Sequence, residues 1–292
     1  MGKNIRIIAR LDIKGPNLVK GIHLEGLRVL GKPEQFARYY YEAGADEMMY
    51  VDIVASLYNR NSLHDIVTKT AKEIFIPLTV AGGIRTIDDI REMLRAGADR
   101  VSLNTAAIKR PEIIREASRK FGSSTIVVTI EAIKQQDGSY LAYTDNGREF
   151  TGIEVLSWAR RVEELGAGEI VITSVDREGT GRGFDIELTR MIAEAVTIPV
   201  IAHGGAGSVE DIKSVIKDGG ADAVAIASML HYEFINKNKM SGDYKKEGNI
   251  EFLKSGRGFS KVDTTTLPEI KKYLNSNNVS CRYDLNTVQS YV

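Results

Sequence analysis

Short apolar runs alternate along this chain with longer stretches that carry apolar residues on one helical face. The runs are mostly aliphatic and rich in β-branched side chains, as expected of parallel strands that are buried on both faces. Eight such strands are predicted, at residues 5–8, 48–51, 78–80, 100–103, 126–130, 169–173, 200–202 and 223–226.

The stretches between these strands have the period of amphipathic helices. They include residues 33–43, 87–96, 111–121, 153–165, 186–195 and 209–218, and many begin at Pro, Ser, Thr or an acidic residue. Eight strands alternating with helices predict a closed parallel (β/α)8 barrel, with a doubly wound open sheet as the second choice.

An internal repeat favours the barrel. Residues 81–90 read AGGIRTIDDI and residues 203–212 read HGGAGSVEDI, while Gly-Ala-Asp occurs at both 97–99 and 220–222. The offset is close to half of a barrel, so the chain is expected to consist of two similar half-barrels. Such a repeat is hard to reconcile with an asymmetric open sheet.

One stretch breaks the pattern. Residues 236–266 are rich in Lys, Gly, Asn and Ser and follow the last predicted strand. We expect a single barrel domain over residues 1–282, with 236–266 inserted as a loop on its C-terminal rim and 283–292 as a tail. The insertion is either part of the active face or a plain surface loop.

Composition narrows the class of protein. Lys+Arg and Asp+Glu both number 39, so the chain lacks the basic excess of a nucleic-acid binder. No apolar run approaches the ~18 residues of a membrane span, and charges interrupt the first apolar stretch. With one cysteine, Cys281, and no metal-ligand spacing around His23, His64 or His231, we expect a cytoplasmic protein without metal or other cofactor.

Two Gly-Gly turns are candidate phosphate sites. Gly82-Gly83 and Gly204-Gly205 each follow a strand and open a helix, where backbone N–H groups and the helix dipole favour an anion. Further candidate substrate or phosphate ligands at strand ends and in loops are Lys20, Asn104, Thr105, Asp176, Thr180, Ala227 and Ser228. Matched sites in both halves predict an elongated substrate with two phosphates, although each turn alone could be purely structural.

Two carboxylates occupy equivalent places in the halves. Asp12 and Glu131 follow the first strand of each half, so both are expected over the barrel axis, where one can donate a proton while the other accepts one. Lys14 and Lys134 follow them at similar distances. The alternative is that each acid is a helix cap or a member of an ion pair. His203 at the rim is a candidate ligand or second acid–base group.

Four charged residues gather at the opposite end of the barrel. They lie at or next to the start of the first, second, fourth and sixth predicted strands and could ring the bottom of the barrel: Arg6, Glu47, Arg100 and Glu169. A charged ring there is costly unless fully paired, which suggests a gate or passage. The alternative is a solvated bottom face.

Together these residues resemble a known family, the cyclase subunits of imidazole glycerol phosphate synthase in histidine biosynthesis. The matching segments cover residues 5–232 in order and include LDIKGPNLVKG, GADEMMYVDIVAS, FIPLTVAGGIRTIDD, GADRVSLNTAAI, ELGAGEIVITSVDREGTGRGFDIELT, IPVIAHGGAG and GGADAVAIAS.

The resemblance implies an activity. Such enzymes form a heterodimer with a glutaminase docked on the bottom of the barrel. Ammonia passes through the barrel and attacks phosphoribulosyl-formimino aminoimidazole carboxamide ribonucleotide, which carries two phosphates. The products are imidazole glycerol phosphate and aminoimidazole carboxamide ribonucleotide. By resemblance, Asp12 is the first catalytic acid, the four charged residues form the ammonia gate, and Asp99 lies at the glutaminase interface.

Departures from the family lie at the active face. Glu131 stands where an aspartate is usual, Arg10 where a small residue is usual, and His203 where a serine is usual. Arg100 replaces the usual gate lysine. These changes leave an alternative open, a paralogous ammonia channel that works with a glutaminase and supplies ammonia for amidation of a surface-polysaccharide sugar. An isomerase of the same pathway is a weaker alternative, because a charged gate has no use there.

Overall fold

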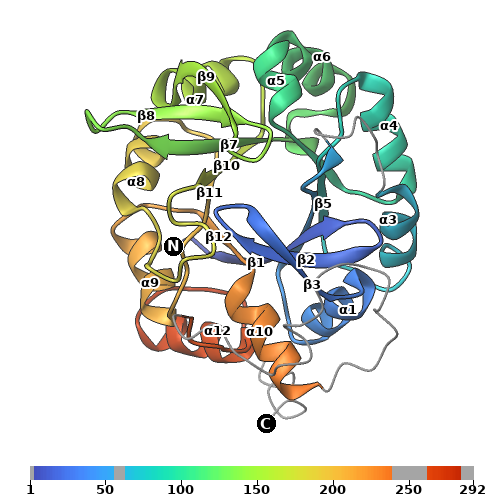
Figure 1. The fold of residues 1–292 in the computed structure, drawn as a ribbon, viewed down its shortest axis with the longest axis vertical. Coiled ribbons are helices and arrows are strands. Elements are labelled where there is room, and N and C mark those ends of the chain that lie inside the picture. Colours follow the sequence, from blue (N-terminus) through green and yellow to red (C-terminus); the bar gives the residue numbers. More distant parts are fainter. Residues whose placement is uncertain (1–2, 56–62, 239–261, 284–292) are drawn as a thin grey trace.

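The barrel predicted from the alternating pattern is present. The computed structural model describes residues 3–55, 63–238 and 262–283. Eight parallel strands form its wall, β1 (Arg6–Lys14), β4 (Glu47–Asp52), β5 (Leu78–Ala81), β6 (Arg100–Leu103), β7 (Ile126–Lys134), β10 (Glu169–Ser174), β11 (Val200–His203) and β12 (Ala223–Ile226). Figure 1 looks down the barrel and shows the strands as a ring enclosed by helices.

The register closes the sheet on itself. The strands follow the order β10-β11-β12-β1-β4-β5-β6-β7, and β7 pairs again with β10. Ile8 lies opposite Glu47 across β1 and β4, and Glu169 lies opposite Val127 across β10 and β7. An open sheet would end in two unpaired edges, so this closure excludes the doubly wound alternative.

Helices cover the outside of the wall. They are α1 (Pro33–Glu42), α3 (His64–Thr70), α4 (Ile87–Ala96), α5 (Thr105–Lys109), α6 (Glu112–Phe121), α7 (Val155–Glu164), α8 (Ile186–Ala195), α9 (Val209–Lys217), α10 (Ser228–Lys237) and α12 (Leu267–Ser276), with a 3-10 turn η1 at Ser123–Thr125. The six helices predicted from periodicity correspond to α1, α4 and α6–α9. The sequence pattern did not single out α3, α5 or α10.

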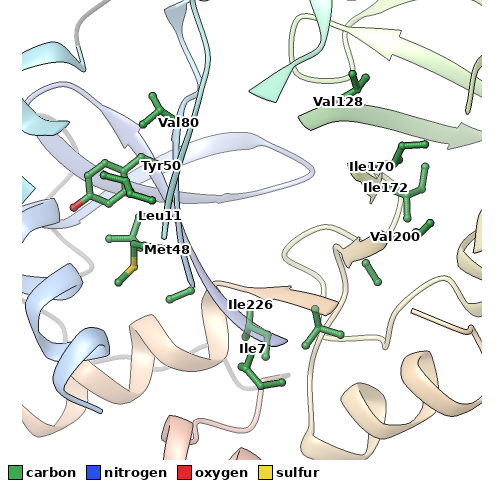
Figure 2. Close-up of a cluster of buried hydrophobic side chains, with 14 of the residues drawn as sticks. Ile7, Leu11, Met48, Tyr50, Val80, Val128, Ile170, Ile172, Val200 and Ile226 are labelled. Atoms are coloured by element: carbon green, nitrogen blue, oxygen red, sulfur yellow. The ribbon is translucent and has the colours of Figure 1, made fainter. Parts of the chain in front are cut away.

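Alternation along each strand divides its side chains between two layers. Ile7, Met48, Val128 and Ile170 point outward and join the main core between strands and helices, as Figure 2 shows. The other alternation points into the barrel, where Ile8, Met49, Val127, Val171, Ile201, Ala223 and Ala225 form a separate apolar cluster. This inner cluster fills the middle of the barrel.

Two hairpins extend the wall at its C-terminal rim. The first, β2 (Asn17–Ile22) with β3 (Glu25–Gly31), follows β1, and the second, β8 (Tyr140–Thr144) with β9 (Glu149–Glu154), follows β7. In Figure 1 the first hairpin crosses the barrel mouth. Neither hairpin was among the eight strands predicted from the sequence, so the predicted number of strands was too low.

Equivalent hydrogen bonds occur in the two half-barrels. Thr86 caps α4 through a reciprocal bond with Asp89, and Ser208 caps α9 through the same bond with Asp211. Each half also places a hairpin directly after its first strand. The two-fold repeat predicted from the sequence is therefore present in the fold.

Parts of the expected domain plan fall outside the described residues. Most of the 236–266 insertion, residues 239–261, and most of the tail, residues 284–292, lie there, so both assignments stay predictions. Among the described residues, no helix is long and apolar enough to cross a membrane. The same residues hold no group of three His, Cys, Asp or Glu side chains placed to bind a metal ion.

Candidate active site at the barrel mouth

Asp12 and Glu131 both lie at the C-terminal rim, near the ends of β1 and β7. Asp12 alternates with Arg10 and Ile8 on the inward face of β1, and Glu131 alternates with Thr129 and Val127 on β7. Both side chains are buried, with exposed fractions of 2% and 8%. Their surroundings differ, and this difference sets their charges.

Asp12 is surrounded by cations. Arg10 Nε donates to Asp12 Oδ1 at 2.9 Å, and Lys20 Nζ, from β2, lies 3.4 Å from Oδ2. Burial by itself would raise the pKa of Asp12, but the charges of Arg10 and Lys20 outweigh it and hold that pKa well below its usual value. Asp12 is therefore a permanent carboxylate at neutral pH.

Glu131 receives hydrogen bonds but forms no ion pair with any residue that the structure describes. The backbone N–H of Gly147, in the β8–β9 turn, donates to Glu131 Oε2 at 2.8 Å, and the Asn104 side chain also bonds to it. Burial raises the pKa of Glu131 to about 7, because these hydrogen bonds and the charge of Arg10 offset only part of the desolvation. Glu131 can therefore gain or lose a proton near neutral pH.

A cavity of about 260 Å³ opens beside Glu131 over the first half of the barrel. Its lining includes Arg10, Asp52, Gly82, Gly83, Arg85, Ser102, Asn104, Thr105, Lys109, Arg110, Thr129, Glu131, Asp145 and Asn146. Four of these side chains are cations, which suits an anionic ligand. Asn104 Oδ1 is buried here without a hydrogen-bond partner among the described residues, so it is available to a ligand donor.

The first glycine turn faces this cavity. Gly82 and Gly83 are partly exposed and have φ of 93° and 74°, in the region that favours glycine. A Cβ on Gly82 would lie 2.3 Å from the carbonyl oxygen of Asp52, so no other residue fits. The structure thus brings Gly82, Gly83, Asn104 and Thr105 together around one cavity, as the sequence pattern suggested.

The second glycine turn is more enclosed. Gly204 and Gly205 are buried, and the backbone N–H of Gly183 donates to Gly205 O at 2.8 Å. Ala227 and Ser228, at the start of α10, are 6% and 8% exposed. The loop after β10 therefore covers this turn, and its role as a phosphate site stays a prediction.

Three other predicted ligands have partners within the protein. Lys20 forms ion pairs with Glu178 and Asp12, so it would have to release one of them to hold a phosphate. Asp176 accepts from the backbone N–H of Lys134 at 2.8 Å, and the Thr180 hydroxyl donates to Arg177 O at 2.7 Å. Their contacts with the substrate stay predictions.

His203 lies deeper than the sequence suggested. Its Nδ1 is 3.1 Å from Arg10 Nη1 and 3.3 Å from the Thr173 hydroxyl, and the side chain is 5% exposed. Burial and the nearby charge of Arg10 keep the pKa of His203 well below its usual value. His203 is thus neutral, accepts through Nδ1, and acts as a partner of Arg10.

The predicted charged ring forms at the opposite end. Arg6 pairs with Glu47 at 2.7 Å and with Glu169, and Arg100 pairs with the same two carboxylates at 3.2 and 3.0 Å. Glu47 and Glu169 are buried, whereas about a quarter of each arginine side chain is exposed. The ring is fully paired, so the solvated-face alternative does not describe these four residues.

Asp99 stands next to Arg100 on the same face. Asp99 is exposed, and its carboxylate accepts from the backbone N–H of Leu78 at 2.8 Å. Asp222 holds Val200 in the same way in the other half, at 2.9 Å. Asp99 therefore helps to hold the start of β5 through this hydrogen bond. Its place in a glutaminase interface stays a prediction.

Sequence reasoning missed two contributors to the site. Glu178, 1% exposed, binds Lys20 and accepts from the backbone N–H of Leu24, tying the first hairpin to the loop after β10. Gly147 bonds to Glu131 from the second hairpin. The Asn146-Gly147 pair is a typical hairpin-turn signal and could have revealed this turn.

Comparison with known proteins identifies the family. A model of the family described as histidine biosynthesis protein matches residues 6–236. The imidazole glycerol phosphate synthase subunit HisF of Legionella pneumophila is 56% identical over 208 residues, covering 71% of this chain and 98% of the relative. The subunit of the same name from Alkaliphilus metalliredigens (strain QYMF) is 48% identical over 231 residues, or 79% of this chain and 92% of the relative. The chain therefore belongs to the histidine biosynthesis protein family, together with the HisF subunits of imidazole glycerol phosphate synthase.

Proposed function

We propose that this chain is the cyclase subunit of imidazole glycerol phosphate synthase and that Asp12 and Glu131 are its catalytic carboxylates. It takes ammonia from a glutaminase partner and converts phosphoribulosyl-formimino aminoimidazole carboxamide ribonucleotide into imidazole glycerol phosphate and aminoimidazole carboxamide ribonucleotide. The observation that carries the proposal is a pair of buried carboxylates at one barrel mouth, of which Asp12 is held ionised by Arg10 and Lys20 while Glu131 can exchange a proton near neutral pH.

The chemistry needs both states. Ammonia must lose protons as its nitrogen becomes bonded to carbon, and the nitrogen that leaves when a carbon–nitrogen bond breaks must gain one. Glu131, whose pKa is about 7, can carry a proton in either direction, while the fixed charge of Asp12 stabilises cationic stages of the reaction.

The phosphates of the substrate are assigned to the two glycine turns. The first lies at Gly82-Gly83, where Arg85, Lys109 and Arg110 line the same cavity and supply positive charge. The second is proposed at Gly204-Gly205, with Ala227 and Ser228 at the start of α10. Three more residues are assigned to substrate binding once the loop that follows β10 rearranges: Lys20, Asp176 and Thr180.

The ring of Arg6, Glu47, Arg100 and Glu169 is proposed as the ammonia gate. It closes the N-terminal end of the barrel, and the apolar cluster above it leads toward Arg10 and the mouth. The glutaminase is proposed to dock on this end, forming a heterodimer in the cytoplasm. Asp99 and Phe75, which is 79% exposed before β5, lie on the same end and are offered as contacts.

The test is turnover with external ammonia. The purified protein should consume the bis-phosphate substrate at high ammonium and alkaline pH, as followed by absorbance. Asp12→Asn and Glu131→Gln should each lower kcat by a factor of about 10² or more. Absence of wild-type turnover, combined with activation of a glutaminase that binds the protein, would instead favour the ammonia-channel module.

A further inference from the structure

The upper layer of the barrel contains a compact cluster of four charges. Arg10 and Lys20 contribute two cations, and Asp12 and Glu178 contribute two anions. All four side chains are at most 5% exposed. The cluster is neutral as a whole, but Arg10 is the member that also lines the cavity beside Glu131.

The guanidinium of Arg10 has a fixed orientation. Its Nε binds Asp12 Oδ1 at 2.9 Å and its Nη1 binds His203 Nδ1 at 3.1 Å, so partners on β1 and β11 hold it. A guanidinium does not lose its proton in proteins and its planar donors have fixed geometry. Arg10 therefore supplies a constant charge that is bonded to Asp12 and lines the same cavity as Glu131, and that charge lowers the pKa of both carboxyls.

We propose that Arg10 is a positioning residue that divides the work of the two carboxylates, holding Asp12 ionised and leaving Glu131 as the group that exchanges protons with the substrate. The role in turnover rests on the proposed cyclase function, whereas the effect on the charges of Asp12 and Glu131 does not.

Other groups also face each of the two acids. Asp12 also faces Lys20 from β2 and neutral His203 from β11, and Lys20 is shared with Glu178 at the loop after β10. Glu131 faces Asn104 after β6, the Gly147 N–H and Asp145. Lys20 is farther from Asp12 than Arg10 is, at 3.4 Å against 2.9 Å, so Arg10 should have the larger effect.

The first experiment is a carbon-13 NMR titration of the side-chain carboxyl carbons, which needs no activity. Asp12→Asn and Glu131→Gln serve only to assign the two signals. In the wild type the Glu131 signal should titrate near pH 7, and the Asp12 signal should stay ionised down to the acid limit of the folded protein. An Asp12 signal that titrates at about 4, its ordinary range, would overturn the proposal without any variant.

The variants Arg10→Gln and Arg10→Lys separate charge from shape. Gln keeps a hydrogen-bond donor without charge, so the Asp12 midpoint should rise by about one pH unit or more and the Glu131 midpoint should rise with it. Lys keeps the charge and should restore most of both shifts. Arg95→Gln, on the exposed face of α4, removes the same charge far away and should move neither signal. Unchanged midpoints in Arg10→Gln would assign the effect to Lys20 and refute the proposal.

The second experiment is the pH profile of ammonium-driven turnover. The limb of kcat/KM near pH 7 should move upward in Arg10→Gln, in step with the NMR midpoint of Glu131, and should return in Arg10→Lys. A limb that stays in place while the NMR midpoint moves would refute the catalytic division of labour. If the wild type has no turnover but the NMR shifts occur, the cyclase assignment fails and the action of Arg10 on the two acids stands.

Discussion

The buried carboxyl of Glu131 makes the stability of this protein depend on pH in a way that one substitution should remove. In the folded protein the pKa of Glu131 is about 7, against an ordinary value of 4.5 in the unfolded chain. The folded state therefore keeps a proton that the unfolded state releases between these values. Stability falls as pH rises through this window and stays lower above it.

The size of this effect follows from the pKa difference. The penalty that Glu131 imposes on folding is about 1 kcal/mol at pH 5 and about 3 kcal/mol at pH 8. Glu131→Gln has no proton to lose and can still accept from Gly147, so it escapes the penalty. Relative to the wild type, the variant should gain about 2 kcal/mol in free energy of unfolding between pH 5 and pH 8, worth about 5 °C in Tm.

The assay is chemical and thermal unfolding of both proteins at the two pH values. Glu149→Gln, at an exposed position where β9 begins, is the matched control and should follow the wild type at both. A stability gap between Glu131→Gln and wild type that is the same at pH 5 and pH 8 would show that Glu131 does not keep its proton in the folded protein. The expected gain in free energy of unfolding means that the buried carboxyl of Glu131 destabilises the folded wild-type protein, as is common for residues at functional sites.

Other predictions concern the glycine turn at Gly82-Gly83, the proposed glutaminase-docking end of the barrel and the charged ring. Gly82→Ala should lower the affinity for inorganic phosphate or substrate about tenfold or more by calorimetry, because its Cβ would meet Asp52 O, while Gly138→Ala, also at positive φ but with open space around it, should leave that affinity intact. Phe75→Ala should weaken glutaminase binding about tenfold and change the free energy of unfolding by less than about 0.5 kcal/mol, and an unchanged Kd would remove Phe75 from the interface. Arg6→Met leaves Glu47 and Glu169 with Arg100 alone and should cost about 2 kcal/mol of stability in urea unfolding, and an unchanged midpoint would show that the ring contributes nothing to folding.

The wall of the barrel was predictable because each strand is buried on both faces and therefore reads as an apolar run. The limits of β6, Arg100–Leu103, agree with the prediction. The predicted first strand ended too early, because the inward-pointing residues Arg10 and Asp12 of β1 are polar and interrupt the apolar run. The hairpins were not predicted because their strands are buried by contacts at the rim of the barrel, and such contacts leave no continuous apolar run in the sequence. The turn of the first one, at His23 and Leu24, has positive φ at two residues that carry no turn signal.

The candidate site was predictable in position and less so in electrostatics. The repeat located Asp12 and Glu131 in matched places, yet nothing in the spacing says that one is paired with Arg10 and the other is not. That difference depends on which side chains from β2, β11 and the second hairpin reach the mouth. Contacts of this kind join residues far apart in the chain, so a local pattern does not contain them.

The apolar cluster of Ile8, Met49, Val127, Val171 and Ile201 lies between the ring at the bottom and Arg10 at the mouth. A cation crossing this belt would lose its hydration without a counter-charge, so the proposed ammonia passage would admit neutral NH₃ and exclude ammonium. Ammonia added to the solution is mostly protonated at neutral pH and must first lose a proton, whereas ammonia released by the proposed glutaminase partner would start neutral. Glutamine should therefore remain an effective nitrogen source at acidities where added ammonium salts no longer support turnover.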